Sequence, residues 1–206
     1  ANLQCKFGKI PFVATGMNPN LVTEQKIDIL INAGLRRARI GIQTGSERIS
    51  TEVYNRKMIK KNIIHCSEIL SRYSKQLVPT AYDVILDNPW EKPEDLVDTF
   101  NLISQLKRPF VLNVFSLAFY PNTAIYKKAF QSGIINTTEY SGGYSKNFLD
   151  WSSNYLNLLI ALQGLVPIPS FLQRYLLGEK IVKKNPLIPG FFKDLINTLT
   201  IARKVY

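Results

Sequence analysis

The chain has 206 residues, and its 26 Lys and Arg against 15 Asp and Glu give a formal net charge of +11. Hydrophobic residues make up 46% and charged residues 20%, which excludes a wholly disordered chain, a collagen-like chain and a disulfide-stapled scaffold. The two cysteines, Cys5 and Cys66, can neither form a disulfide framework nor supply a four-thiolate cluster. This cysteine usage favours a reducing, cytoplasmic compartment.

Short apolar runs alternate with amphipathic stretches over the first 130 residues, and these patterns predict strands and helices respectively. We expect strands over residues 12–15, 39–42, 78–86 and 110–119. We expect the main helices over residues 23–34, 59–73, 93–106 and 123–133. Strands and helices that alternate with short links are typical of parallel βαβ units.

The pattern changes after residue 134, where only helical stretches follow, over residues 147–165, 169–183 and 189–206. Four strands are too few for a closed eight-stranded barrel, but they form a piece of one. We therefore predict an α/β fold in which residues 1–135 belong to a partial (β/α) TIM-like barrel. Residues 136–206 are predicted to form a helical C-terminal extension.

Polar residues cluster where the predicted strands end, which is where parallel α/β folds place their chemistry. Residues 43–47 combine an amide, two hydroxyls, a glycine and a carboxylate. Such a cluster can bind a ribose or an amino-acid head group, and it is equally typical of a helix N-cap. Further clusters follow the first strand at residues 15–18, the third at 87–91 and the fourth at 120–123.

Asp83 lies inside an otherwise apolar strand, where an unpaired charge would be costly. We expect it either to pair with a base such as Arg56 or to face a polar cavity. His65 and Cys66 fall inside a predicted helix without a cluster of further ligands, so we predict no metal site. With one His and no phosphate-binding glycine loop, the sequence argues against a Ser/His/Asp hydrolase and a kinase, and no catalytic residue is assigned.

Several stretches, taken in order, resemble the radical S-adenosylmethionine (radical SAM) enzymes, specifically the cobalamin-binding subfamily. Residues 23–27 (TEQKI), 33–37 (AGLRR) and 40–49 (IGIQTGSERI) are similar to that family's third helix, fourth strand and following loop. Residues 82–91 (YDVILDNPWE) are similar to its fifth strand, and 120–126 (YPNTAIY) to the turn after its sixth. The resemblance covers residues 12–135.

The resemblance implies the C-terminal half of a six-stranded partial barrel that binds SAM and a [4Fe–4S] cluster. In this family the cluster reduces the sulfonium, and the resulting 5′-deoxyadenosyl radical abstracts hydrogen from the substrate. The parent protein would be an iron–sulfur oxidoreductase or a methyltransferase. Its implied partners are an electron donor such as flavodoxin or ferredoxin and a small-molecule or lipid substrate, which the sequence does not identify.

The resemblance also implies a set of cofactor-binding residues, namely Gln43, Ser46, Glu47, Arg56, Asp83, Ile85, Leu86 and Asn88. The first three match the positions after the family's fourth strand that meet the ribose and methionyl part of SAM. The next two occupy positions that are polar and close to SAM in relatives. The last three lie on the fifth-strand motif that flanks adenine.

Two features depart from the family pattern. The C-x3-C-x2-C loop, whose three thiolates hold the cluster and leave one iron open, has no match among the two cysteines. Asp87 and Trp90 also stand where the family carries small residues. We expect the cluster loop and any cobalamin domain to lie upstream of Ala1, and this chain alone to be inactive. The alternative is a degenerate barrel that acts as a binding or scaffold domain.

The basic charge suits an anionic partner, and lysine-rich solvated helix faces are the simpler explanation of it. The absence of interleaved aromatic and basic motifs argues against nucleic acid. Apolar pairs near basic residues, at 171–172, 176–177 and 191–192, favour a peripheral membrane association or a lipid substrate as an alternative. The first strand of half a barrel would be left unpaired, which predicts self-association through its edge.

Overall fold

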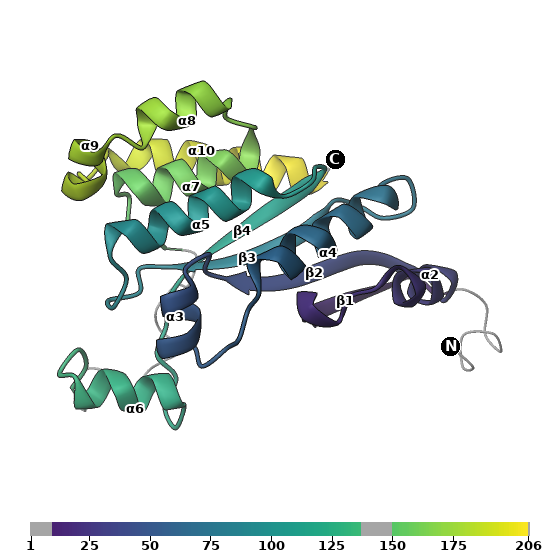
Figure 1. The fold of residues 1–206 in the computed structure, drawn as a ribbon, viewed down its shortest axis with the longest axis horizontal. Coiled ribbons are helices and arrows are strands. Elements are labelled where there is room, and N and C mark those ends of the chain that lie inside the picture. Colours follow the sequence, from purple (N-terminus) through teal and green to yellow (C-terminus); the bar gives the residue numbers. More distant parts are fainter. Residues whose placement is uncertain (1–9, 137–149, 206) are drawn as a thin grey trace.

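The computed structural model describes residues 10–136 and 150–205 (Figure 1). Its single sheet has four parallel strands, β1 (Phe12–Met17), β2 (Leu35–Gln43), β3 (Thr80–Leu86) and β4 (Phe110–Ser116). The strands pair in the order β1-β2-β3-β4, so each strand lies beside its neighbour in the chain. Successive parallel neighbours joined by helical crossovers are the arrangement found along a (β/α) barrel. The predicted α/β fold is confirmed.

The helices fall into two groups. Those interspersed with the strands, besides the short 3-10 turn at Pro19–Leu21, are α2 (Glu24–Asn32), α3 (Glu47–Glu52), α4 (Lys60–Arg72), α5 (Pro93–Gln105) and α6 (Ala124–Gln131). Those of the extension are α7 (Tyr155–Leu165), α8 (Ser170–Leu176), α9 (Glu179–Lys184) and α10 (Gly190–Val205). In Figure 1, α5 and α7 run side by side, and α8 and α9 lie beyond α7.

Two of the helix predictions for the extension are wrong in detail. The helix expected over residues 147–165 begins only at Tyr155, because the Asn154 side chain caps it by accepting a hydrogen bond from the Asn157 amide at 2.9 Å. Residues 147–149 lie outside the described part of the chain. The helix expected over residues 169–183 is two helices, because the chain leaves the helical conformation at Gly178, which caps α9.

The two faces of the sheet differ in their side chains, because successive side chains of a strand point to opposite sides. On one face Ile40, Val84 and Leu112 are buried in the main hydrophobic core. Residues of the extension, among them Trp151 and Leu159, belong to that same core. The extension thus packs on the sheet directly, and the predicted boundary at residues 135 and 136 stays a prediction.

Asp87 ties the extension to the sheet. It follows β3 with a positive φ of 56°, a conformation that Asp tolerates better than most residues. Its Oδ2 accepts hydrogen bonds from Ser116 Oγ at 2.8 Å and from the Ser152 amide at 2.9 Å. Its Oδ1 accepts one from Asn157 Nδ2 at 3.0 Å. One carboxylate therefore holds the ends of two strands against the start of α7.

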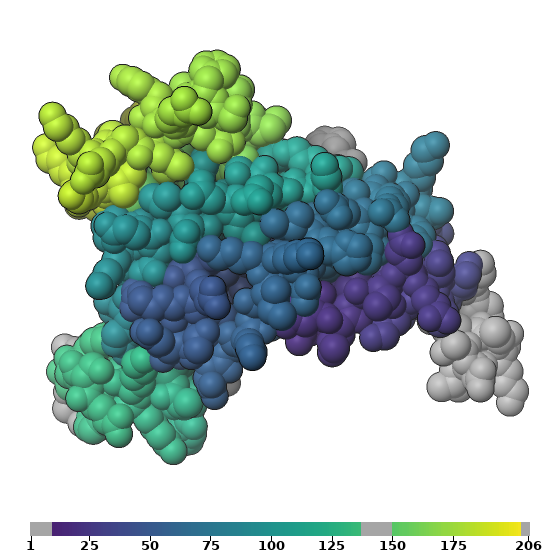
Figure 2. All heavy atoms as spheres, viewed as in Figure 1, coloured from purple at the N-terminus to yellow at the C-terminus, as the bar shows by residue number. Residues whose placement is uncertain are grey.

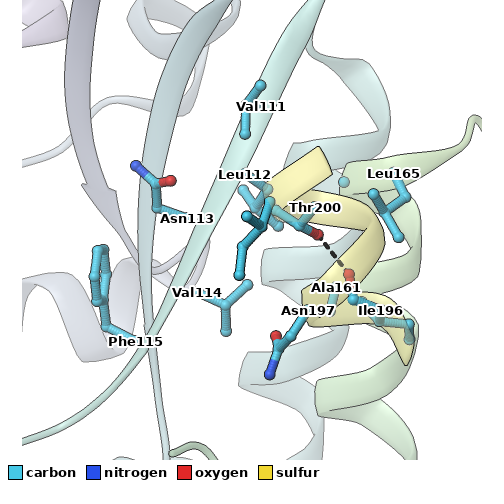
Figure 3. A pocket seen from close by; sticks show the side chains of 12 residues that line it. Val111, Leu112, Asn113, Val114, Phe115, Ala161, Leu165, Ile196, Asn197 and Thr200 are labelled. Atoms are coloured by element: carbon cyan, nitrogen blue, oxygen red, sulfur yellow. Dashed lines mark hydrogen bonds between the residues drawn. The ribbon is translucent and has the colours of Figure 1, made fainter. Parts of the chain in front are cut away.

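The two edges of the sheet differ. Among the described residues, β1 pairs only with β2, so its outer edge has no strand partner. The predicted self-association through that edge stays a prediction. At the other edge β4 faces α7 and α10, and a cavity of about 200 Å³ lies between them (Figure 3). Leu112 and Val114 point toward these helices, whereas Asn113 and Phe115 point to the other side of β4.

Gly45, which follows β2, fixes how closely α5 approaches the loop that leads into α3. Its amide donates to Thr99 Oγ1 at 2.8 Å, and a Cβ at this position would lie 2.5 Å from Thr99 Cα and 2.6 Å from the Asp98 carbonyl oxygen. Both obstructing atoms belong to the backbone of α5, so no side-chain rotation can relieve the clash.

We therefore expect Gly45→Ala to lower the free energy of unfolding by about 1–3 kcal/mol, the usual cost of overpacking. Urea unfolding followed by circular dichroism measures this. Gly190→Ala is the matched control, because a Cβ on Gly190 would meet no atom within 4 Å apart from its chain neighbours and the backbone of its own helix. Equal stability of the two variants would contradict the close approach of α5.

Candidate functional site

A cavity of about 440 Å³ lies on the face of the sheet opposite the main core. Alternation along the strands selects its lining, since Arg39, Gly41 and Gln43 of β2 line it while Ile40 and Ile42 are buried in the core. Residues of β1, β3, β4 and the loop that follows β4 complete the lining, namely Gly16, Asp83, Ile85, Phe115, Ser116, Leu117, Ala118 and Tyr120, together with Arg56. The volume falls within the usual range for small-molecule sites.

Asp83 occupies the centre of this face. It pairs in register with Gly41 on β2 and with Asn113 on β4. Arg39 Nε donates to both Asp83 oxygens, at 2.9 Å to Oδ1 and 2.7 Å to Oδ2, and Asn113 Nδ2 donates to Oδ1 at 2.7 Å. The Asp83 side chain is 18% exposed and that of Arg39 is 38% exposed. Asp83 thus both pairs with a base and faces a cavity.

The base that pairs with Asp83 is Arg39, and the expectation of Arg56 is wrong on this point. Arg39 lies two residues before Gly41 on the same face of the neighbouring strand, so its guanidinium reaches Asp83 along the sheet surface. Alternation along β2 places residues 39, 41 and 43 on one face of the strand, and the pairing of Gly41 with Asp83 puts Asp83 on that same face. Asn113, a polar residue within the apolar run of β4, carried the same signal as Asp83.

Arg56 reaches the cavity from the segment after α3. Its backbone is fixed by two hydrogen bonds with Ser50, in which the Arg56 amide donates to the Ser50 carbonyl at 2.8 Å and Ser50 Oγ donates to the Arg56 carbonyl at 2.6 Å. A Cβ on Gly41 would lie 3.7 Å from Arg56 Nη1, so the guanidinium sits over the glycine of β2. Within residues 10–136 and 150–205 its guanidinium makes no ion pair.

Gln43 ends β2 with a φ of 69°, in the left-handed region. The other residues besides glycine with positive φ in the described part of the chain are Asn or Asp, types that enter this region at lower cost. Backbone strain at a residue that lines a cavity is characteristic of functional sites. Gln43, which the sequence resemblance had selected, is therefore also distinguished by its left-handed backbone conformation.

Four of the eight predicted cofactor residues, Gln43, Arg56, Asp83 and Ile85, line this one cavity. The other four do not line it, and their role stays a prediction. Ser46 caps α3 by accepting from the Ile49 amide, and Glu47 is an exposed residue of its first turn. Leu86 is buried on the helix-covered face, and Asn88 bonds to the Tyr54 hydroxyl and the Trp90 amide.

Asp95, which the sequence analysis did not select, holds the loop after β2. Its Oδ1 accepts from Ser46 Oγ at 2.5 Å, and its Oδ2 accepts from Arg48 and, at 2.8 Å, from the Lys92 amide. Burial alone would raise the pKa of Asp95, but these hydrogen bonds to its charged form outweigh burial and lower it. The carboxylate therefore fixes the loop between Gln43 and Arg56 to the start of α5.

The described residues do not offer a site for an iron–sulfur cluster. They contain no group of three or more His, Cys, Asp or Glu side chains placed to hold a metal. Cys66 is buried in α4, and burial raises the pKa of its thiol to about 12, which disfavours the thiolate that a cluster needs. Cys5 lies outside the described residues. A cluster with three thiolate ligands does not fit the residues present.

No family model and no curated protein matches the sequence. Among solved structures, coproporphyrinogen III oxidase from Escherichia coli, a radical SAM enzyme, is similar with a TM-score of 0.49 and 22% identity over 57% of this chain. The radical SAM methyltransferase TsrM from Kitasatospora setae, solved with cobalamin and a [4Fe–4S] cluster, is similar with a TM-score of 0.46 and 16% identity over 60% of this chain.

This chain spans about a quarter of the length of each of these structures, 26% of the first and 23% of the second. At such scores and identities, the likeness assigns neither a site residue nor a reaction to this chain.

Glu91, like Asp95, has a carboxyl group whose pKa is shifted by its surroundings. Burial, and next to it the charge of Asp95, raises the pKa of Glu91 from about 4.5 to about 8. The folded state then holds this proton more tightly than the unfolded chain does. Its contribution to stability is complete below pH 4.5 and is lost as the pH rises to about 8.

We expect Glu91→Gln to remove part of this decline, so that the variant exceeds the wild type in stability at pH 8.5 but not at pH 5. Since one pKa unit corresponds to about 1.4 kcal/mol, a change of at least about 1 kcal/mol between the two pH values is expected. Urea unfolding at both pH values measures it. Glu94→Gln, at an exposed position of α5, is the control, and the same pH response in both variants would refute the assignment.

Proposed function

We propose that the 440 Å³ cavity binds S-adenosylmethionine and that the chain is the SAM-binding part of a radical SAM enzyme. One observation carries the proposal. Gln43, Arg56, Asp83 and Ile85, which the sequence resemblance selected from three separate segments, converge on one cavity.

The chemistry of the lining fits the parts of this cofactor. The Arg56 guanidinium, which is without an ion-pair partner among the described residues, suits the carboxylate of the methionyl group. Asp83 retains acceptor capacity for hydroxyl or ammonium groups beyond its bonds to Arg39 and Asn113. Ile85 offers an apolar surface for a base. Bound SAM supplies an organic radical precursor, while these residues bind and orient it.

The chain by itself is assigned cofactor binding and not the reductive step. The residues present do not fit the cluster that reduces SAM, and no step is derived through it. The assignment to the cobalamin-binding subfamily, the distinction between oxidoreductase and methyltransferase, the electron donor and the substrate are all predictions from the sequence resemblance.

SAM binding to the chain tests the proposal directly. We expect isothermal titration calorimetry to detect binding to the wild type and Arg56→Met to weaken it at least about tenfold, which is a loss of about 1.4 kcal/mol. Arg72→Met is the matched control, because Arg72 is an exposed residue that pairs with Glu24, outside the cavity. A wild type that does not bind SAM, or equal affinities in all three proteins, would refute the proposal.

Asp83→Asn separates a cofactor site from a scaffold that has kept only the barrel shape. If Asp83 contacts SAM, the variant loses affinity by more than its loss of stability explains, as judged at a temperature where both proteins are fully folded. A scaffold predicts lower thermal stability without any SAM binding to lose. Calorimetry and thermal unfolding on the same samples distinguish the two.

We also expect anaerobic reconstitution of the chain with iron and sulfide to leave no [4Fe–4S] absorbance, because the chain has only two cysteines and the cluster needs three thiolate ligands. Absorption near 400 nm and iron content measure this. A stoichiometric cluster that cleaves SAM would overturn the assignment of the chain to cofactor binding alone.

A further inference from the structure

The end of the molecule formed by α8, α9 and the start of α10 exposes large apolar side chains. Tyr175 and Leu187 are each 82% exposed and Phe171 is 76% exposed, more than any other large apolar residue in the described part of the chain. Figure 2 shows α8 and α9 as the yellow-green surface at one end of the molecule. Single exposed apolar residues are ordinary, but a concentration of them marks an interaction surface.

Helix geometry explains why these side chains are left outside. Phe171 and Tyr175 are four residues apart and share one face of α8. The opposite side is held inward, since Leu176 and Leu177 pack against the main core and the Tyr155 hydroxyl donates to the Leu176 carbonyl at 2.9 Å. Leu176 and Leu177 are thus partly buried and, unlike Phe171 and Tyr175, face the core.

The beginning of α10 continues this pattern. Ile196 packs against the main core, whereas Phe191, Phe192 and Leu195 remain exposed. The rings of Phe191 and Phe192 lie 4.0 Å apart. The helix therefore carries apolar side chains on its outer as well as its inner side.

The charge of the same segment is positive. Residues 166–202 contain five basic side chains, Arg174, Lys180, Lys183, Lys184 and Lys193, and only two acidic ones, Glu179 and Asp194. Lys183 pairs with Glu179 at 2.6 Å, and Lys193 pairs with Asp150 at 2.6 Å. The ion pairs of the described residues leave Arg174, Lys180 and Lys184 without an acidic partner.

We propose that this end of the chain, the α8–α9 surface with the first turn of α10, docks on an anionic lipid surface. Exposed aromatic side chains next to lysines match the chemistry of a bilayer interface, where rings enter the headgroup region and cations meet anionic headgroups. Each basic side chain near such a surface adds attraction. Among the described residues, no helix is long and apolar enough to cross a bilayer.

Charge complementarity decides for lipid over a second copy of the chain. Two copies that met through this surface would bring their unpaired basic residues together, at an electrostatic cost. An anionic bilayer removes that cost and takes up the apolar side chains at the same time. The inference is independent of SAM binding, because none of the residues involved lines the 440 Å³ cavity.

Vesicle co-sedimentation of the full chain tests the proposal. We expect the wild type to sediment with vesicles of phosphatidylcholine and phosphatidylglycerol in equal parts, and at least about tenfold less with phosphatidylcholine alone. The double variant Phe171→Ser/Tyr175→Ser should lose binding at least about tenfold. Leu21→Ser/Ile29→Ser removes two exposed apolar residues outside this surface and should bind like the wild type.

The variant Lys180→Glu/Lys184→Glu changes two exposed residues of α9 and should lose binding to the anionic vesicles. It keeps the test informative if the α8 variant does not fold. Circular dichroism verifies folding of every protein. The proposal would be overturned if the wild type did not sediment or sedimented equally with both vesicle types. It would also be overturned if the Phe171/Tyr175 and Lys180/Lys184 variants bound as well as the wild type. A dimer in the absence of vesicles that the α8 variant converts to monomers would overturn it as well.

Discussion

The open face of the sheet is organised around one charge, the carboxylate of Asp83. A charged side chain on a strand that is paired on both sides must be neutralised locally, since its desolvation would otherwise oppose folding. Arg39 and Asn113 do this from β2 and β4, so side chains as well as backbone join the three strands. Because this face of the sheet carries polar groups, the apolar residues of the same strands lie on the other face, where helices cover them.

Two further carboxylates hold the carboxyl ends of the strands. Asp95 holds the loop after β2 to the start of α5, and Asp87 holds the ends of β3 and β4 to the segment before α7. Each accepts hydrogen bonds from several donors, and for Asp95 these bonds lower the pKa. Burial and the charge of Asp95 raise the pKa of Glu91, and its hydrogen bonds, which include one of 3.4 Å with the Thr44 hydroxyl, do not offset them. The pKa of Asp95 is thus lowered and that of Glu91 raised at the same end of the sheet.

Local patterns in the sequence predicted the elements but not their partners. Apolar runs and caps such as Thr23 located the strands and most helices, because these depend on neighbouring residues. The choice of Arg39 over Arg56 for Asp83 depends on the register of β2 against β3, which no local pattern encodes. Leu86, one residue from Ile85, points into the core rather than the cavity because successive side chains of a strand point to opposite faces. The sequence shows a glycine at position 178, but the helical pattern on both sides of it did not indicate that the helix would end there.

The position of β4 relates the two ends of the molecule to each other. Phe115 lines both the polar cavity and the smaller cavity beside α7 and α10, so this edge strand is a wall common to the two. The Asn113 and Phe115 side chains point to the side of β4 away from α7 and α10, whereas Leu112 and Val114 point toward these helices (Figure 3). On its inner side α10 contacts α7 and β4, and on its outer side it exposes Phe191, Phe192 and Leu195. Cavity and exposed surface are thus separate in their residues and connected through one strand.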